Sequence, residues 1–253
     1  VVVLSPEEQD ITKGPPAERR SFFDRVFSVV SPEYLQTLQN YSRTLKQRNA
    51  ALLQLRDNII TEEDLETWAK PLSLSGSKLW KLRGRFMADF CALLASIVQQ
   101  YDSEIKMEIL YSASVQDEEQ YLKIIVKKIR QDILQGRTGY GPHRDDMVLN
   151  WSGRNIKSFG SQGEHKLCLI LLKLVELFFI KEKTGTSPTL LLDDLFAKLD
   201  LERSKNIVHL LQELESSSGE PVQTIVTTTD LLNVENSGLM SASPDHCTYH
   251  LER

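Results

Sequence analysis

The amino-acid sequence predicts an α/β protein with a largely parallel core sheet and an inserted, mostly helical arm. Two observations in the last third of the chain support the sheet: short apolar runs alternate with helical segments, and two of those runs end in polar or acidic residues. The arm is indicated by long stretches with apolar side chains at helical spacing. We therefore assign residues 1–30 and 140–253 to the sheet-containing part and residues 31–139 to the helical insertion.

The first predicted element is a strand at Val1–Leu4, which a turn at Ser5-Pro6 ends. No basic segment of a signal peptide precedes it. Because a domain rarely opens within a strand, we expect the sequence to begin inside a larger protein.

The arm is predicted as three helical stretches and one strand. Ser31-Pro32-Glu33 is a helix start, with serine as the N-cap and proline in the first turn. A break at Pro71–Ser77 is expected to separate this helix from a second one. Residues 104–111 alternate apolar and polar side chains, as in a strand with one buried face. A third helix runs from its cap at Asp117 to Gly136.

The last third begins with two short strand candidates, 148–151 and 155–157, around a turn at Ser152-Gly153. The segment FGSQGEHK then opens a helix so apolar that it must be buried nearly all round. A strand beginning at Thr189, an amphipathic helix to about Leu214 and a strand within PVQTIVTTTD complete the alternating order that favours parallel pairing.

The bulk composition is that of an ordinary globular protein. The chain has 253 residues, of which 41% are hydrophobic and 26% charged, with a net charge of −5. Any contact with nucleic acid must therefore be local. Three scattered cysteines without a CxxC suit a reducing compartment, and no uninterrupted apolar run reaches membrane-spanning length. We expect a cytoplasmic protein without membrane contact.

The apolar run Thr189–Leu192 ends in two adjacent carboxylates, Asp193 and Asp194. Ligands of parallel sheets bind beyond the carboxyl ends of the strands, where the polar run Thr227–Asp230 also falls. Mg²⁺ is usually held by one or two carboxylates together with phosphate oxygens and water. The sequence therefore suggests a magnesium site, and the alternative is a strand that stops at two exposed acids capping the next turn.

Ser161 and Gly163 lie at the start of the apolar helix. Free backbone N–H groups and the helix dipole favour an anion there, glycine permits close approach, and a serine hydroxyl can donate to a phosphate. The alternative is an ordinary serine N-cap with a glycine nearby. The 32 residues from Ser161 to Asp193 leave room for one helix and a return loop.

These motifs together resemble the head of an ABC-type ATPase. SQGE is similar to the signature motif, LLLDD to the Walker B strand, and AKLD at Ala197–Asp200 to the D-loop. With GPHRDD at Gly141–Asp146 and QTIVTTTD at Gln223–Asp230, the order is that of the RecF family of bacterial recombination and replication-repair ATPases. LSPEE, KGPPAERRSFFD and SPEYLQTLQNYSRTLKQRNALL extend the resemblance over essentially the whole chain.

The resemblance implies a catalytic pair of carboxylates. Asp193 would orient Mg²⁺ through its water shell. Asp194 stands where many ABC ATPases carry the glutamate that polarises the attacking water. Because aspartate is one methylene shorter, we expect slow hydrolysis.

The resemblance also implies a nucleotide-binding set that acts between subunits. Ser161, Gln162 and Gly163 would contact the γ-phosphate of ATP bound by a partner subunit, so that ATP joins a homodimer. Asp200 would lie at the dimer seam. Thr229 stands where transporters carry a switch histidine, which puts a histidine-based sensor in doubt.

The phosphate loop GxxxxGK[ST] is absent from these residues. The nearest glycine pair, Gly136 and Gly141, is followed by Pro142 where lysine is required. In RecF proteins this loop lies upstream of the segment that VVVLSPEE resembles. We therefore expect ATP and Mg²⁺ to bind only with an additional N-terminal segment, and we expect an exposed apolar surface where that segment would pack.

Three polar stretches have two interpretations each. The loop His143–Asp145 is either held by a local ion pair or faces the nucleotide or dimer seam. Two basic runs are either solvated helix faces or DNA-binding patches that contact phosphates, with Trp80 stacking or packing beside the first. The candidate DNA-binding residues are Lys78, Lys81, Arg83, Arg85, Lys127, Lys128 and Arg130.

The family resemblance implies an ATPase of DNA recombination, replication, repair and the SOS response, associated with the nucleoid. ATP would close a dimer around double-stranded DNA near single-strand gaps, and the implied partners are RecR and RecO, which act in loading RecA. One alternative is a non-catalytic fragment that binds DNA or protein. Another is a chromosome-maintenance head, disfavoured because the insertion is too short and irregular for a long coiled coil.

Overall fold

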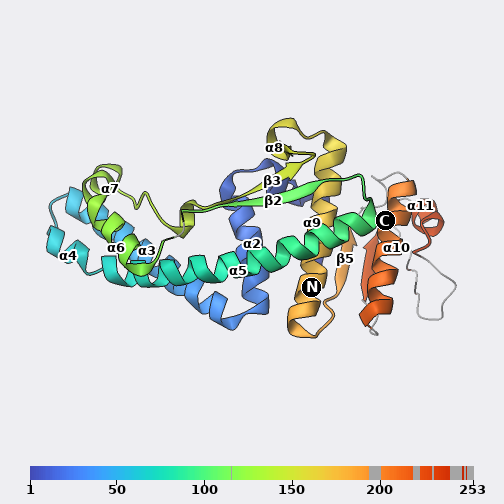
Figure 1. Ribbon diagram of the computed structural model, residues 1–253, viewed down its shortest axis with the longest axis horizontal. Helices are drawn as coiled ribbons and strands as arrows, with labels where there is room; N and C mark the ends of the chain where they lie inside the picture. Colours follow the sequence, from blue (N-terminus) through green and yellow to red (C-terminus); the bar gives the residue numbers. More distant parts are fainter. Residues whose placement is uncertain are drawn as a thin grey trace.

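The computed structural model describes residues 1–114, 116–193, 201–218, 223–229 and 231–239, together with Cys247 and Tyr249. The molecule is elongated, with a helical arm on the left of Figure 1 and a small sheet with its helices on the right. The predicted α/β organisation with a mostly helical insertion is confirmed.

The core sheet is parallel, as predicted. It contains β1 (Val2–Leu4), β5 (Leu190–Asp193) and β6 (Thr224–Thr227) in the order β1-β5-β6. Both neighbouring pairs are parallel, with Val2 opposite Leu190 and Leu190 opposite Thr224.

The two faces of this sheet differ in burial. Val2, Leu4, Leu190 and Leu192 point to one face and are buried in the core. On the opposite face Val3 and Ile225 are 40% and 48% exposed. Parallel sheets are normally covered on both faces, whereas this face presents apolar side chains to solvent; that an additional segment packs here stays a prediction.

Helix α9 (Gln162–Thr184) forms the centre of the core. Every residue from Leu167 to Ile180 is buried, as the predicted all-round burial requires. The helix ends at Gly185, whose φ of 69° is left-handed and whose N–H donates to the carbonyl of Lys181. The chain then returns into β5.

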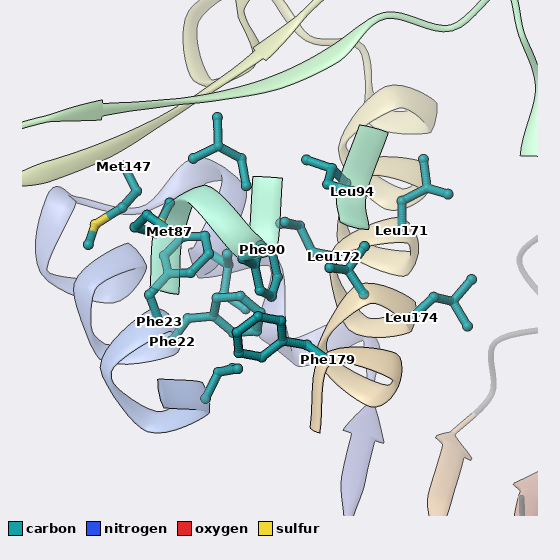
Figure 2. Packing of buried hydrophobic residues seen from close by; sticks show 14 of the residues in the cluster. Phe22, Phe23, Met87, Phe90, Leu94, Met147, Leu171, Leu172, Leu174 and Phe179 are labelled. Atoms are coloured by element: carbon teal, nitrogen blue, oxygen red, sulfur yellow. The ribbon is translucent and has the colours of Figure 1, made fainter. Parts of the chain in front are cut away.

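An aromatic cluster joins α9 to its neighbours. The N-terminal segment continues from β1 through η1 (Pro6–Gln9) and α1 (Asp10–Lys13) into α2 (Pro16–Val30). Figure 2 shows Phe22 and Phe23 of α2 packed with Phe90 and Phe179. The Phe23 and Phe90 rings meet edge-on at 5.2 Å, an arrangement worth about 0.5–1.5 kcal/mol beyond area burial.

Among the described residues of the arm, five helices pack against one another. The predicted caps form: the Ser31 and Asp117 side chains accept hydrogen bonds from the N–H groups of Tyr34 and Gln120, and Gly136 closes the last helix with a left-handed φ of 64°. The helices are α3 (Pro32–Arg56), α4 (Glu62–Glu66), α5 (Ala69–Tyr101), α6 (Glu118–Lys127) and α7 (Ile129–Gln135).

The predicted helix break at Pro71–Ser77 is wrong, because α5 runs through it without interruption. Pro71 is the third residue of the helix, where a backbone N–H would have no partner within the helix. Gly76 allows α6 to pack closely against α5, because a Cβ atom at this position would lie 2.5 Å from Cε1 of Tyr121 on α6. Glycine therefore marks a contact between helices.

An antiparallel ribbon connects the arm to the sheet-containing part. Its strands are β2 (Met107–Ser112), β3 (Asp146–Trp151) and β4 (Arg154–Asn155), in the order β2-β3-β4. The predicted turn at Ser152-Gly153 is confirmed by positive φ values at both residues. The candidate strand 155–157 is wrong beyond Asn155, whose side chain caps α8 (Ile156–Phe159).

Helices α10 (Leu201–Ser218) and α11 (Leu231–Asn236) complete the described structure, and α10 agrees with the predicted amphipathic helix. α10 packs against α5 and α11. Among the residues that the structure describes, none of the helices combines the length and apolar character needed to span a membrane.

Candidate functional site

The candidate magnesium site lies where the three parallel strands end. Asp193, the last residue of β5, is exposed. The Thr227 hydroxyl at the end of β6 donates to Asp193 Oδ1 at 2.6 Å. The Ser5 hydroxyl, which follows β1, donates to Asp193 Oδ2 at 3.5 Å. The predicted meeting of Asp193 with the threonine run is therefore confirmed at Thr227.

Ser5 was missed by the sequence reasoning. The available signal was its position as the first polar residue after the β1 strand, which is also a carboxyl end of the parallel sheet. Thr229 is exposed two residues beyond the end of β6. Its role in nucleotide sensing stays a prediction.

The donor chemistry at this edge fits Mg²⁺ bound together with phosphates. Within the described ranges, no three His, Cys, Asp or Glu side chains gather into a protein-only metal cage. Mg²⁺ usually keeps several waters and takes only one or two carboxylates besides substrate phosphates. Asp193, oriented by two hydroxyl groups, provides one such carboxylate.

The catalytic candidate Asp194 and the seam candidate Asp200 lie outside the described residues, as does the segment similar to a D-loop. Their roles stay predictions.

The start of α9 is a capping box. The Ser161 hydroxyl oxygen accepts from the Glu164 N–H at 3.3 Å, and the Ser161 N–H donates to Glu164 Oε2 at 2.6 Å. The backbone hydrogen bond from Ser161, followed by the side-chain one, lowers the pKa of Glu164. Because the hydroxyl oxygen acts here as an acceptor, its own proton can still be donated to an anion.

The surroundings of this helix start also suit an anion. Ser161 and Gln162 are exposed and Gly163 is half-buried. A Cβ atom on Gly163 would lie 3.4 Å from Nη1 of Arg203, so a guanidinium group stands beside the first turn. The geometry is compatible with both the N-cap and the phosphate-binding interpretation of SQGE.

Ser161 and Asp193 belong to the same helix–strand unit, but no contact links these two described residues. α9 and β5 run in opposite directions around a short return, so the helix start and the strand end point the same way. The helix rises about 34 Å, whereas the four-residue strand covers only about 13 Å. Ser161 therefore projects well beyond Asp193, which suits a serine that serves a second subunit.

Two contacts fix the segment between β1 and α2 onto α9. His165 Nδ1 lies 2.9 Å from the Thr12 hydroxyl. Lys173 is 1% exposed and its Nζ lies 2.9 Å from Glu8 Oε2 and 2.9 Å from Glu176 Oε2. The chain that carries Ser5 is thus held in place by a buried ion-pair cluster that the sequence reasoning did not anticipate.

The first basic run divides into exposed and buried residues. Arg83 does not belong to a DNA-binding surface: its side chain is 1% exposed and pairs with Asp145 at 2.7 Å and with Asp24 at 3.0 Å. Trp80 packs instead of stacking on a ligand, since it is 1% exposed and its Nε1–H donates to Asp145 at 3.0 Å.

The other cations of both runs are at least partly accessible. Lys78, Lys81 and Arg85 are exposed on α5, with Lys78 paired to Glu33 at 2.8 Å and Arg85 above the Phe86 ring. Lys127, Lys128 and Arg130 form the second group, of which Lys128 is half-buried beside the Tyr140 ring. DNA binding by these six residues stays a prediction.

The loop His143–Asp145 mainly faces the interior. Asp145 accepts hydrogen bonds from Arg83, Trp80 and the Tyr111 hydroxyl. His143 Nε2–H must donate to the Thr138 carbonyl, so its Nδ1 accepts from the Tyr41 hydroxyl at 2.6 Å. Burial lowers the pKa of His143 to about 4, which leaves the ring neutral at pH 7. Asp145 is thus held by an ion pair, but its partner is the distant Arg83 and not a neighbour in the loop, as the local interpretation expected.

Comparison with family models found no match. Comparison with curated proteins found relatives called DNA replication and repair protein RecF. The protein from Lachnoclostridium phytofermentans is 37% identical over 238 residues, which cover 94% of this chain and 64% of the relative. The protein from Alkaliphilus oremlandii is 34% identical over 239 residues, which cover 90% and 62%.

Two solved structures of the recombination mediator protein RecF in the RecFOR pathway have the same fold. The RecF-ATP structure superposes with a TM-score of 0.78 at 30% identity, and the RecF-ATPrS structure with 0.77 at 29% identity. Each match covers 90% of this chain and 62% of the other. The predicted fold class, an ABC-type ATPase head with a helical insertion, is confirmed. Over about nine tenths of its length this chain is a RecF-family sequence, and it spans less than two thirds of the relatives that it matches.

Proposed function

We propose that this chain forms the Walker B and signature part of a RecF-type ATPase of DNA replication and repair. The observation that carries the proposal is the convergence of Ser5, Asp193 and Thr227 at the carboxyl edge of a parallel sheet. In this class of nucleotide hydrolase, an acid at the end of an apolar strand holds the magnesium ion. Asp193 would act on Mg²⁺ through water, and Asp194 would orient the attacking water.

ATP binding requires phosphate-binding groups that these residues do not supply, since no GxxxxGK[ST] sequence occurs among them. The relatives are longer than this chain, and the solved structures named RecF-ATP and RecF-ATPrS support nucleotide binding by the family. We infer that ATP and Mg²⁺ bind once additional sequence supplies a phosphate loop.

ATP would join two copies of the protein. The exposed start of α9, with Ser161, Gln162 and Gly163, would contact the γ-phosphate held by the other subunit, and Asp200 and Thr229 would lie near the seam. The projection of Ser161 beyond Asp193 supports this arrangement, because one subunit alone does not bring the two residues to the same phosphate.

DNA would bind to the six accessible cations Lys78, Lys81, Arg85, Lys127, Lys128 and Arg130. Contacts of this kind go to phosphates, so affinity falls with salt and depends little on base sequence. The function would be carried out in the cytoplasm at single-strand gaps, with RecO and RecR as partners in loading RecA.

The proposal is tested by measuring ATP hydrolysis with and without gapped DNA. The chain alone is expected to be inactive, and a chain extended upstream to include a phosphate loop is expected to turn over slowly. Asp193→Asn and Ser161→Arg should each abolish most of that turnover, whereas Lys106→Gln, an exposed change on another surface, should not. The two active-site variants should differ in assembly, since Ser161→Arg should also prevent ATP-dependent dimerisation.

Turnover unaffected by Ser161→Arg would contradict the role of α9 between subunits. An extended chain that binds DNA without any turnover would favour the non-catalytic alternative.

A further inference from the structure

A cleft of about 360 Å³ opens between α2, α3 and η2 (Pro142–Arg144), away from the carboxyl edge of the parallel sheet. One face of α3 forms its wall, because Leu38, Ser42, Leu45 and Lys46 recur at helical spacing along that face. The cleft is therefore lined by apolar side chains, a hydroxyl and a cation from a single helix.

The inner part of the cleft holds a guanidinium group, Arg20, without a direct ion pair to any described residue; the nearby Asp24, Asp145 and Asp146 attract it, but they pair with Arg83 and Arg19. Arg20 of α2 is half-buried and donates from Nη1 to the Asp145 carbonyl at 2.7 Å. Burial, followed by the nearby charge of Arg83, lowers the pKa of Arg20. The guanidinium group is thus held in a place that disfavours its charge.

Asp24, the one acid among the described residues of the lining, attracts Arg20 but makes its direct contacts with Arg83 and Tyr34. Asp24 already accepts two hydrogen bonds from Arg83 Nη2, at 3.0 and 3.1 Å, and another from the Tyr34 hydroxyl. His143 on the other side of the cleft contacts Thr138 and Tyr41 and is neutral at pH 7, because burial lowers its pKa to about 4. Lys46 adds a second cation, exposed and without an ion pair among the described residues.

We propose that this cleft is a docking site for an acidic side chain that a partner protein presents beside an apolar residue. A carboxylate would meet Arg20 and Lys46, and the neighbouring apolar group would pack on Leu38 and Leu45. The volume is at the low end of ligand pockets, which suits a short peptide segment. A nucleic-acid backbone fits less well, because Arg20 is recessed and the carboxylate of Asp24 lines the same cleft.

The test uses a defined pair of peptides. One is an acetylated and amidated nonapeptide of Ser and Gly with Leu-Glu-Leu at its centre, and the other has Leu-Gln-Leu. Binding to the full chain is followed by NMR through the imidazole signals of His143. The Glu peptide is expected to shift these signals and to bind about threefold or more tightly than the Gln peptide, as for an accessible charge pair.

Variants at exposed positions locate the contact without threatening the fold. Lys46→Gln should raise the Kd of the Glu peptide by about threefold. Ser42→Glu should raise it by a similar factor, because it places a competing carboxylate in the cleft. Lys106→Gln, at an exposed lysine that does not line the cleft, should leave the Kd unchanged.

Equal binding of the two peptides, or a Glu peptide that does not shift His143, would overturn the proposal. So would an unchanged Kd in both Lys46→Gln and Ser42→Glu. If a 12-base-pair duplex shifts the same signals and Lys46→Gln removes that effect, the cleft is a DNA phosphate site instead.

Discussion

Arg83 offers the most direct test of how the arm is attached to the rest of the protein. Its guanidinium group, 1% exposed, joins Asp24 of α2 to Asp145 beside η2 and donates to the Pro142 carbonyl at 2.9 Å. Replacing it with glutamine leaves the Asp145 carboxylate buried, and Trp80 and Tyr111 are then its remaining donors among the described residues. Removing one partner of a buried pair costs about 3–5 kcal/mol, and we expect Arg83→Gln to lower the free energy of unfolding by that amount.

The assay is urea and thermal unfolding followed by circular dichroism. For a chain of this size, about 3–5 kcal/mol corresponds to a fall in Tm of roughly 6–20 °C. Lys81→Gln, an exposed change two residues away on the same helix, should stay within about 0.5 kcal/mol. The double variant with Asp145→Asn should lose less than the sum of the two single changes, because the pair is coupled.

DNA binding provides a second readout that separates the two residues. Lys81→Gln should reduce the slope of log affinity against log salt by about one, whereas Arg83→Gln, in conditions where it is folded, should not change the slope. A variant Arg83→Gln with wild-type stability and a reduced salt slope would refute the burial argument and restore Arg83 to the DNA-binding set.

Three further predictions concern other parts of the molecule. In an extended, active chain, Asp193→Asn should reduce ATPase activity by about 10–100-fold, because Asp193 acts on the metal through water; a full rate in steady-state assays would contradict this. Gly76→Ala should lower the free energy of unfolding in urea by about 1–3 kcal/mol through the clash with Tyr121. Gly84 lies in the same helix, and a Cβ atom there would have no neighbour within 4 Å, so Gly84→Ala should be neutral or stabilising by up to about 1 kcal/mol. His143 has a pKa depressed to about 4, so its contribution to stability is complete above its ordinary pKa of about 6.5 and is lost as the pH falls towards 4. His143→Gln should flatten the dependence of the free energy of unfolding on pH in that window. An unchanged pH dependence would count against the assigned hydrogen bonds.

Local chemistry made several features predictable. Ser31, Asp117 and Ser161 each cap a helix through their own side chains, and such caps depend on residues within one turn. The meeting of Asp193 with Thr227 was also predictable, because parallel strands place their carboxyl ends on one edge.

The errors came where a distant segment decides the outcome. A proline and a glycine close together indicate a break when read locally, but Gly76 is required by the approach of α6. Arg83 was grouped with exposed cations by sequence proximity, although it lies four residues after the buried Leu79 and three before the buried Phe86. That helical spacing was the signal for burial, and its acidic partners lie 59 and 62 residues away.

The unbroken course of α5 has a mechanical consequence. Its 33 residues form a rod about 50 Å long, packed against α3 and α6 at one end and against α9 and α10 at the other. A rod without a hinge transmits a tilt along its whole length, so a rotation of about 5° where it meets α10 would swing the far tip by roughly 4 Å. Movements around the ends of the parallel strands would therefore displace the outermost helices of the arm through α5, without any bending of that helix.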